Sequence, residues 1–598
     1  MAAHPPVTSP HRSEIGGAEK QAIARSDRAI IRRIAAVSAA FLIALVLLGQ
    51  GITAPFTKDA EPQSAQWIVD IVDHGNWLVQ YDYYHVVNPK PPLFYWLAAI
   101  GAKATGAHVD EVNARAVSLL AGAILAAEVM AWSAIRLGSG GGWLAFAFLL
   151  GSYGYASRAT TALTDMLMTL LLFSAYFVAM PLVESEVSPW RTVATGVLLG
   201  LAILAKGPVT LVLFGLAILI YLLLRRENPL RYVMRPWPWV TLAIALAIAA
   251  CWYVPAFAYG RSNDFAGVFI RENLGHFMPA SAGGTGEAAR PFYYIVTRTI
   301  DAALPLSLLI PALIFAMFSS SFATNASRGM LYQLAMLLAV ILLFSLASAK
   351  RDDYVLPALP PMAIVFAGLF AGRSDKPEAQ SESEYAANIR DFTVATIAFA
   401  MLAGTLAIFA YMKTGGGIAW FGTHLQSSDA SYAAIFAYGL ARFSPALMGF
   451  VLAMIAGASV CCAGLWYRRS LITGAGLAII CIAGTVLWTG TMRPAEAATR
   501  TLATFAAEVR ARVGADPAIY VAHDNPGFAW YYGGTVPALP LSAASSPIFG
   551  NARIYFVGRP GDLALLAPPI RRRMSIVIQS HVLGGGGPPA LYVIGPSR

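Results

Sequence analysis

Long apolar blocks recur along this chain, and they constrain its fold more than any other feature. A helix that crosses a bilayer needs roughly 20 apolar residues, and many of the blocks approach or reach that length. Hydrophobic residues make up 57% of the 598 residues, while charged residues make up only 12%. Soluble domains carry about 25% charged residues. The sequence therefore argues against a soluble multidomain enzyme and predicts an α-helical polytopic membrane protein.

Thirteen segments are predicted to cross the membrane. They are 34–52, 116–136, 141–157, 163–182, 192–206, 207–224, 238–258, 295–318, 330–348, 354–371, 392–412, 443–466 and 471–489. The third and fifth are the weakest, because Gly and polar residues interrupt them. The stretch 91–106 begins with two prolines and is short for a span. We expect it to form an interfacial or re-entrant helix.

Basic residues predict the orientation, because Lys and Arg collect on the cytoplasmic side of a membrane. The N-terminal segment 1–33 carries basic residues before the first span, among them Lys20, Arg25, Arg28, Arg32 and Arg33. We place this segment in the cytoplasm. Alternation then puts 225–235, 373–391 and Arg468–Arg469 in the cytoplasm as well. The odd number of spans sends the C-terminus to the exoplasmic, periplasmic side.

The predicted membrane domain covers 34–490 and includes two long exoplasmic loops, 53–115 and 259–294. Long loops that are rich in aromatic residues and prolines are often functional. Residues 491–598 change character, with a helical stretch followed by four short strand-like runs near 518–522, 553–558, 575–579 and 591–595. We expect a small periplasmic α/β domain there. The four cysteines lie in apolar blocks, so packing is favoured over a disulfide framework: Cys251, Cys461, Cys462 and Cys481.

Three carboxylates stand out as candidate catalytic groups. Asp59 and Glu61 follow the first span, and Asp165 lies where the fourth span meets the exoplasmic side. Ionisable groups at such positions often mark a functional site. Structural alternatives stay open, because Asp59 and Glu61 suit a solvated loop and Asp165 suits a helix N-cap.

Cations gather on the same side of the membrane. Lys90 lies between two prolines, which stiffen the chain and suit a phosphate contact; a lysine that snorkels to lipid headgroups is the alternative. Further cations and a tyrosine are predicted on this side: Lys206, Lys350, Tyr354, Arg115, Arg158, Arg271, Arg290 and Arg351. The positive-inside rule disfavours so many exoplasmic cations unless a ligand uses them. This pattern favours an anionic, lipid-linked substrate.

Seven motifs appear in a fixed order: DAEPQ (59–63), GNW (75–77), KPPLFYW (90–96), ARAV (114–117), LTDM (163–166), AKGP (205–208) and KRDDYVLP (350–357). The series resembles the bacterial branch of the protein-mannosyltransferase superfamily, which has the GT-C type of membrane fold. Within that branch it is most similar to the lipid A aminoarabinose transferases. The motifs run across about half of the chain.

The resemblance implies a sugar donor on a polyprenyl (undecaprenyl-type) phosphate, an acceptor such as lipid A, inversion at the anomeric carbon and a bacterial inner membrane. Lys90 and Tyr354 match family motifs and are the first candidates for the donor phosphate, followed by Lys206, Arg115 and Arg158. Asp59, or failing that Glu61, takes the catalytic role with support from Asp165. No cofactor is required, a divalent metal is left unassigned, and we expect a monomer with no nucleic-acid partner.

The motifs also depart from the family pattern. The family has adjacent Asp and Glu followed by Arg-Tyr, where this chain has Ala60, Glu61, Gln63 and Ser64. Pro89 stands where the family has an acidic residue. The sugar and the acceptor therefore stay open. A protein O-mannosyltransferase, another envelope-glycan transferase and an inactive scaffold are alternatives; a lipid or solute transporter is disfavoured, because no internal repeat is evident.

Overall fold

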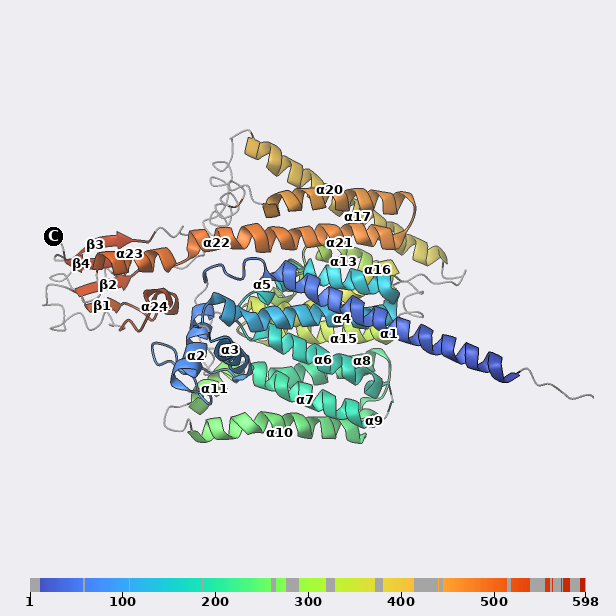
Figure 1. Cartoon of the computed structure of the whole chain (residues 1–598), viewed down its shortest axis with the longest axis horizontal. Coiled ribbons are helices and arrows are strands. Elements are labelled where there is room, and N and C mark those ends of the chain that lie inside the picture. The colour runs from blue at the N-terminus through green and yellow to red at the C-terminus, as the bar shows by residue number, and fades with distance from the viewer. Residues whose placement is uncertain are drawn as a thin grey trace, which may run out of the picture.

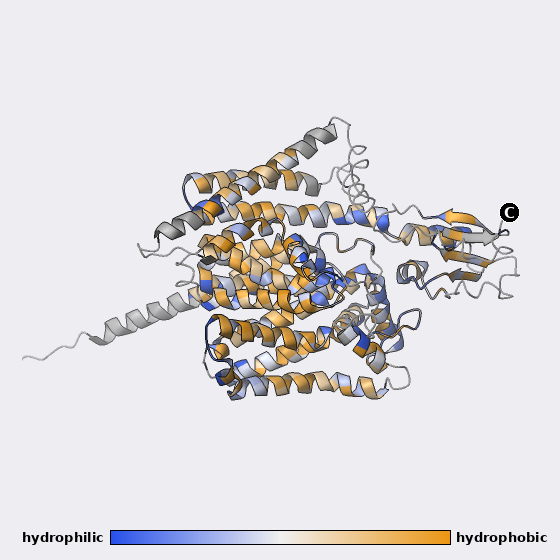
Figure 2. Cartoon of the chain, turned by 180° about the vertical axis from the view of Figure 1, so that it is seen from behind, coloured by the Kyte–Doolittle hydropathy of each residue, from blue (hydrophilic) through white to orange (hydrophobic). Residues whose placement is uncertain are grey.

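The computed structural model describes residues 11–598 except 58–59, 107, 185, 187, 260–264, 276–289, 319–327, 372–379, 414–438, 440–444, 514–517, 538–553, 560–561, 563–571, 573, 581–591 and 597–598. Its helices run side by side in a bundle, and a small sheet lies beyond one end (Figure 1). Hydrophobic residues dominate the length of the helices, and hydrophilic residues gather where the helices end (Figure 2). This distribution is that of a multi-pass membrane protein.

The bundle consists of α1 (His11–Gly49), α4 (Glu111–Leu150), α6 (Asp165–Val183), α7 (Pro189–Lys206), α8 (Val209–Leu224), α10 (Pro236–Tyr259), α13 (Ile310–Phe318), α15 (Arg328–Leu346), α16 (Leu359–Ala371), α17 (Gln380–Lys413), α20 (Pro445–Trp466) and α21 (Ser470–Leu487). Among the described residues, nine helices are long and apolar enough to cross a membrane. The count is up to ten if the bent pair Tyr294–Ala302 and Leu306–Met317 is one span. These criteria do not confirm the predicted thirteen spans.

Helix α4 explains part of the difference, because it contains two helices that meet at Gly138. The backbone of Gly138 leaves helical geometry with φ 78° and ψ 169°. A Cβ atom on Gly142 would lie 2.7 Å from the Cβ of Ala134. Residues eight apart in a straight helix are separated by about 12 Å, so the chain turns back at Gly138. The weak segment 141–157 overlaps the second arm of this hairpin, which the structure ends at Leu150.

Small residues let two of the helices approach closely. Gly196 and Gly200 are spaced by four on α7, and a Cβ on either would lie 2.8 Å from the Cβ of Ile244 or Ile248 on α10. Helices in a bilayer associate largely through such close packing, since lipid tails are as apolar as the side chains. The two glycines therefore let α10 pack directly against α7.

Short helices cover the end of the bundle nearest the sheet: α2 (Ala60–His74), α3 (Leu93–Thr105), α5 (Tyr153–Ala159), α11 (Phe265–Leu274), α12 (Tyr294–Ala302) and the 3-10 helix η5 (Asp352–Ala358). Helix α3 is the element predicted for 91–106. Its 13 residues end at Gly106, whose φ of 64° suits glycine. At about 1.5 Å per residue, α3 is too short to cross a bilayer.

The C-terminal part is a small α/β unit, as predicted from the sequence. Helix α21 continues through a π turn (Trp488–Met492) into α22 (Arg493–Arg500), and α23 (Ala503–Val513) follows. Strands β1 (Ala518–Val521), β2 (Ile554–Gly558), β3 (Met574–Gln579) and β4 (Tyr592–Pro596) form one sheet in the order β1-β2-β4-β3. Helix α24 (Pro526–Tyr532) follows β1 and packs against α2. We call α23, α24 and the sheet the C-terminal domain.

Candidate active site

Two cavities lie among the short helices at this end of the bundle. Both are lined by the segment that joins α5 to α6 and by η5. The wall between them includes an ion pair in which Arg158 Nη2 lies 2.7 Å from Asp353 Oδ1. The smaller cavity has a volume of about 90 Å³ and the larger about 500 Å³. All seven site residues that were predicted and that the structure describes line one or the other.

The smaller cavity collects residues from six separate segments. The predicted members are Lys90, Asp165, Lys206 and Tyr354. Three further charged residues line it, namely Glu272 of α11, Arg351 and Asp353. More than 260 residues separate Lys90 from Tyr354 in the sequence, so only the fold brings them together. We call this the phosphate cavity, because cations and a phenol converge in it.

Lys206 and Asp165 form an ion pair at the meeting point of two helix ends. Asp165 is the first residue of α6, and Lys206 is the last of α7. A carboxylate at a helix N-terminus and a cation at a C-terminus are each stabilised by the helix dipole. The Lys206 ammonium contacts Asp165 Oδ1 and lies 5.3 Å from the centre of the Tyr354 ring. Thr164, and not Asp165, is the N-cap of α6.

Lys90 differs from Lys206, because no described residue forms an ion pair with its ammonium group. Its backbone N–H donates to Asn88 Oδ1 at 3.0 Å, and Asn88 donates in turn to Gln80 Oε1 at 3.0 Å. These bonds fix the backbone, whereas the ammonium group has no hydrogen bond or ion pair to any described residue. Burial lowers the pKa of Lys90, and Glu272 opposes that effect. An anion that entered the cavity would stabilise the charged ammonium.

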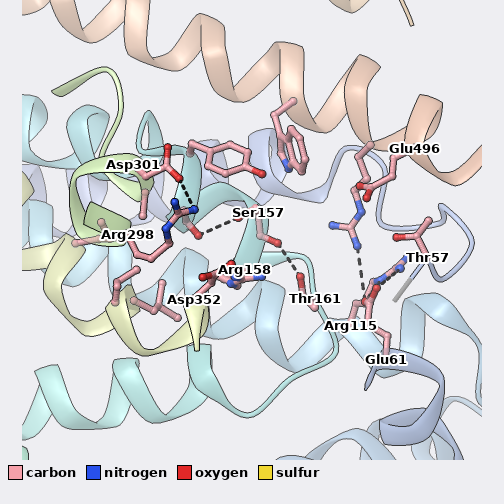
Figure 3. A pocket seen from close by; sticks show the side chains of 18 of the residues that line it. Thr57, Glu61, Arg115, Ser157, Arg158, Thr161, Arg298, Asp301, Asp352 and Glu496 are labelled. Atoms are coloured by element: carbon pink, nitrogen blue, oxygen red, sulfur yellow. Dashed lines mark hydrogen bonds and ion pairs between the residues drawn. The ribbon is translucent and has the colours of Figure 1, made fainter. Parts of the chain in front are cut away.

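Eight charged residues line the larger cavity, which Figure 3 shows from close by. They are Glu61, Arg115, Arg158, Arg298, Asp301, Asp352, Arg493 and Glu496. Most of these side chains already have partners within the protein. Arg298 Nη1 lies 3.0 Å from Asp301 Oδ2 (Figure 3), Tyr294 donates to Asp352, and Arg500 Nη1 lies 3.2 Å from Glu496 Oε1.

Arg115 and Glu61 form a buried, two-pronged ion pair. Arg115 Nε lies 2.8 Å from Glu61 Oε1, and Nη2 lies 3.1 Å from Oε2. Their exposed fractions are 1% and 3%. The remaining nitrogen, Nη1, donates to the carbonyls of Ile52 and Ala54. Such planar, bidentate pairing is a property of arginine that lysine lacks.

The same carboxylate holds two further groups. Glu61 Oε1 accepts from the backbone N–H of Ala162 at 3.1 Å and lies 3.9 Å from Arg493 Nη2. Burial by itself would raise the pKa of Glu61, but Arg115, Arg493 and the Ala162 N–H together lower it. Glu61 therefore stays ionised and fixed. We call Glu61, Arg115 and Arg493 the charge clamp; it ties α2 and α4 to the segment before α6.

The predicted residues thus fall into two groups. Lys90, Asp165, Lys206 and Tyr354 line the phosphate cavity, while Glu61, Arg115 and Arg158 line the larger one. Asp59 lies outside the described residues. Lys350 lines neither cavity among the described residues, since its ammonium donates to the backbone carbonyls of Arg290 and Ala347.

Sequence reasoning missed Glu272, Asp353 and Arg493. Arg493 had a signal in the sequence, because it follows the last apolar span directly and a proline follows it. Asp353 lies within the motif KRDDYVLP, next to Tyr354, and Glu272 had no signal that separates it from an ordinary loop charge. Within the described ranges, no three His, Cys, Asp or Glu side chains group closely enough to hold a metal ion.

Comparison with known proteins supports the resemblance inferred from the motifs. A family model described as dolichyl-phosphate-mannose-protein mannosyltransferase matches residues 89–254. An undecaprenyl phosphate-alpha-4-amino-4-deoxy-L-arabinose arabinosyl transferase of Pseudomonas savastanoi pv. phaseolicola is 26% identical over 337 residues, which are 55% of this chain and 59% of that protein. A transferase of the same name from Aeromonas salmonicida is 27% identical over 322 residues, 52% of this chain and 56% of that protein. The chain thus matches less than two thirds of the length of these relatives.

The fold extends further than the sequence similarity. The crystal structure of ArnT from Cupriavidus metallidurans bound to undecaprenyl phosphate has a TM-score of 0.67 to this chain at 17% identity. The match covers 95% of this chain and 99% of that one. The predicted GT-C fold class, with its small C-terminal sheet, is confirmed.

Proposed function

We propose that this chain is a polyprenyl-phosphate-sugar dependent glycosyltransferase that transfers a sugar to lipid A on the periplasmic side of a bacterial inner membrane. The phosphate cavity carries this proposal. Lys90, Lys206 and Tyr354 come from three distant elements and line one space at the end of the membrane bundle. The names of the similar proteins supply the donor class, an undecaprenyl phosphate sugar.

The charges around the phosphate cavity suit that donor. The cations that line it or pair with its lining residues are Lys90, Lys206, Arg351 and Arg158, and the carboxylates are Asp165, Glu272 and Asp353. The lining itself carries three cations and three carboxylates, and Arg158 reaches Asp353 from the larger cavity. A polyprenyl phosphosugar is a phosphodiester with one negative charge, which the Lys90 ammonium group can bind.

The reaction would break the bond between the anomeric carbon and the phosphate oxygen and form a bond to an acceptor oxygen. Negative charge then grows on the leaving lipid phosphate. Cations that are already in position stabilise such charge without reorganising, and Lys90 and Lys206 are placed to do this. A single displacement inverts the anomeric carbon.

The larger cavity is our proposed site for the acceptor headgroup. It adjoins the phosphate cavity through Arg158 and provides about 500 Å³. Glu61 is a poor general base here, because both of its oxygens accept from Arg115. A phosphate acceptor is already an anion and needs no base, which favours a lipid A phosphate over a neutral hydroxyl. Asp59 stays the predicted base for any hydroxyl acceptor.

A protein O-mannosyltransferase is the second candidate, because the matching family model carries that description. A protein acceptor brings a neutral Ser or Thr hydroxyl, so this reaction would need a free carboxylate near the phosphate cavity. Asp165 already contacts Lys206 through Oδ1, so its carboxylate is not free for this role. The identity of the acceptor therefore distinguishes the two proposals directly.

The orientation that we propose has the N-terminus in the cytoplasm and both cavities on the periplasmic side. Helix α1 begins at the end of the bundle away from the sheet (Figure 1). A single cysteine at the exposed position Arg512, with the native cysteines replaced by alanine, tests this in intact cells. Labelling by an impermeant maleimide supports the orientation, and labelling only after lysis contradicts it.

Mass spectrometry of envelope glycolipids tests the function. Lipid A and core oligosaccharide from cells with and without the gene are compared, with Lys90→Ala as the inactive control. We expect one added sugar on lipid A that disappears in both the deletion and the control. Unchanged glycolipids together with a loss of sugar from envelope proteins would favour the protein mannosyltransferase.

A further inference from the structure

The C-terminal domain contacts the loop 52–57, which follows α1. Several contacts join α24 and its N-cap Asn525 to the first loop and α2. Gln66 Nε2 donates to the Pro526 carbonyl at 2.8 Å, Tyr84 donates to the Asn525 carbonyl at 3.2 Å, and the rings of Phe56 and Trp530 lie 5.6 Å apart. More than 400 residues separate the partners in sequence. The C-terminal domain is therefore packed against the end of the bundle that contains the two cavities.

Tyr531 is the central residue of this interface. Its hydroxyl accepts from the backbone N–H of Phe56 at 2.6 Å and donates to Glu111 Oε1 at 2.9 Å. Glu111 lies in the first turn of α4. Burial and the neighbouring Glu111 raise the pKa of Tyr531, so the hydroxyl keeps the proton that it donates. One phenol thus connects the C-terminal domain, the loop and the start of α4.

The loop that Tyr531 holds also supports the charge clamp. The carbonyls of Ile52 and Ala54 accept from Arg115 Nη1, and the ring of Phe56 lies 4.8 Å from the Arg115 guanidinium carbon. Arg115 in turn binds Glu61, which accepts from the N–H of Ala162. Ala162 lies three residues before Asp165 in the sequence. A continuous series of contacts therefore runs from the domain to the segment before α6, which leads to Asp165.

We propose that Tyr531 is a positioning residue, through which the C-terminal domain sets the loop 52–57 and the charge clamp over the larger cavity. This deepens the proposed function and rests on it. Neither Tyr531 nor α24 lines the phosphate cavity. Loss of the tyrosine hydroxyl should therefore impair sugar transfer while donor binding is kept.

Hydrogen–deuterium exchange tests the positioning without reference to activity. Purified full-length Tyr531→Phe is compared with wild type in lipid nanodiscs. We expect faster exchange at Phe56, which loses its acceptor, and also at Ala162, by about tenfold, the scale of one lost buried hydrogen bond. The amides of β1, β2 and β4 should keep their wild-type rates. Wild-type exchange at Ala162 would overturn the proposal, and faster exchange throughout the sheet would replace it with a folding defect.

Steady-state kinetics with an undecaprenyl phosphate sugar and lipid A gives the second readout. We expect kcat to fall about tenfold in Tyr531→Phe with the KM for the donor unchanged. Tyr84→Phe is the matched control, because it removes one hydroxyl hydrogen bond from the same interface without touching Phe56; its kcat should stay that of wild type. Glu111→Gln keeps an acceptor for Tyr531 and should also retain kcat.

The two readouts separate the proposals. Absence of transfer by wild-type protein contradicts the proposed function, while exchange at Ala162 still decides the positioning. Equal kcat losses in Tyr531→Phe and Tyr84→Phe would mean that docking of the domain matters as a whole, and the specific role of Tyr531 would be wrong.

Discussion

The two cavities contain the same kinds of charged residue, but these residues differ in the hydrogen bonds and ion pairs that they already make. In the larger cavity, Arg115 uses its three nitrogens on Glu61 and on the carbonyls of Ile52 and Ala54. In the phosphate cavity, the Lys90 ammonium has no hydrogen bond or ion pair to any described residue. A cation that is fully paired stabilises the fold, whereas one that is not can bind an incoming anion. Residue type alone does not distinguish these roles, but the partners do.

Arg115→Ala should produce the largest effect, and it should be an effect on stability. Removing one partner of a buried ion pair costs roughly 3–5 kcal/mol, because the other charge is left unpaired. Thermal unfolding of the purified protein measures this. Arg191→Ala is the control, since its pair with Glu186 is more exposed and such pairs contribute about 1 kcal/mol or less. If the variant kept wild-type stability but lost turnover, the role of Arg115 would be in the reaction and not in the charge clamp.

Lys90→Ala should impair the reaction and leave stability unchanged, the opposite of the Arg115 result. Loss of a charge-assisted contact costs roughly 1.5–3 kcal/mol, so the affinity for undecaprenyl phosphate should fall by at least about tenfold. Isothermal titration in detergent measures it. Lys103→Ala, an exposed lysine on α3, should bind like wild type. An equal affinity in Lys90→Ala would remove Lys90 from the donor site.

The charge clamp should also make the protein sensitive to acid. The pKa of Glu61 is lowered from its ordinary value of 4.5 in the folded protein, so the unfolded state binds this proton more readily. Its contribution to stability is present above pH 4.5 and is lost as the pH falls through the lowered value. The Tm difference between wild type and Glu61→Gln should therefore shrink below pH 4.5. A constant difference from pH 7 to pH 3 would contradict a clamp that depends on charge.

The smallest effect is expected at the wall between the cavities. Arg158 pairs with Asp353, and both side chains are partly exposed, so Arg158→Lys should keep the charge and lose at most about 1 kcal/mol. We expect turnover to fall less than about fivefold. Arg298→Lys, at a more exposed pair with Asp301, should show no change. A loss as large as that in Lys90→Ala would assign Arg158 to the donor phosphate.

Much of the architecture follows from local patterns along the chain. The apolar block at 238–258 became α10, that at 330–348 became α15, and that at 471–489 became α21, because a backbone in a bilayer must satisfy its hydrogen bonds within each helix. The hydropathy pattern was less informative at 295–318, which forms two helices bent by 109°.

Candidate residues were found from the sequence because membrane proteins have few charges outside their loops. Lys90 and Lys206 stood out by their proline and glycine neighbours. Glu272 gave no such signal, because its place in the site depends on how α11 packs: the fold brings Glu272 and Lys90 into one cavity. Arg493 gave a weak one, because its partner Glu61 lies more than 400 residues earlier.

The sequence by itself determined that this chain has many apolar helices long enough to cross a membrane and that its charged residues lie mainly at their ends. Those properties depend on composition and on spacing over short distances. The tertiary structure decided which charges have partners. Glu61 lies in a loop-like motif that suits a catalytic carboxylate, yet Arg115 and Ala162 occupy its oxygens. Ion pairing depends on distances of a few ångströms between segments far apart in the chain, and only packing sets those distances.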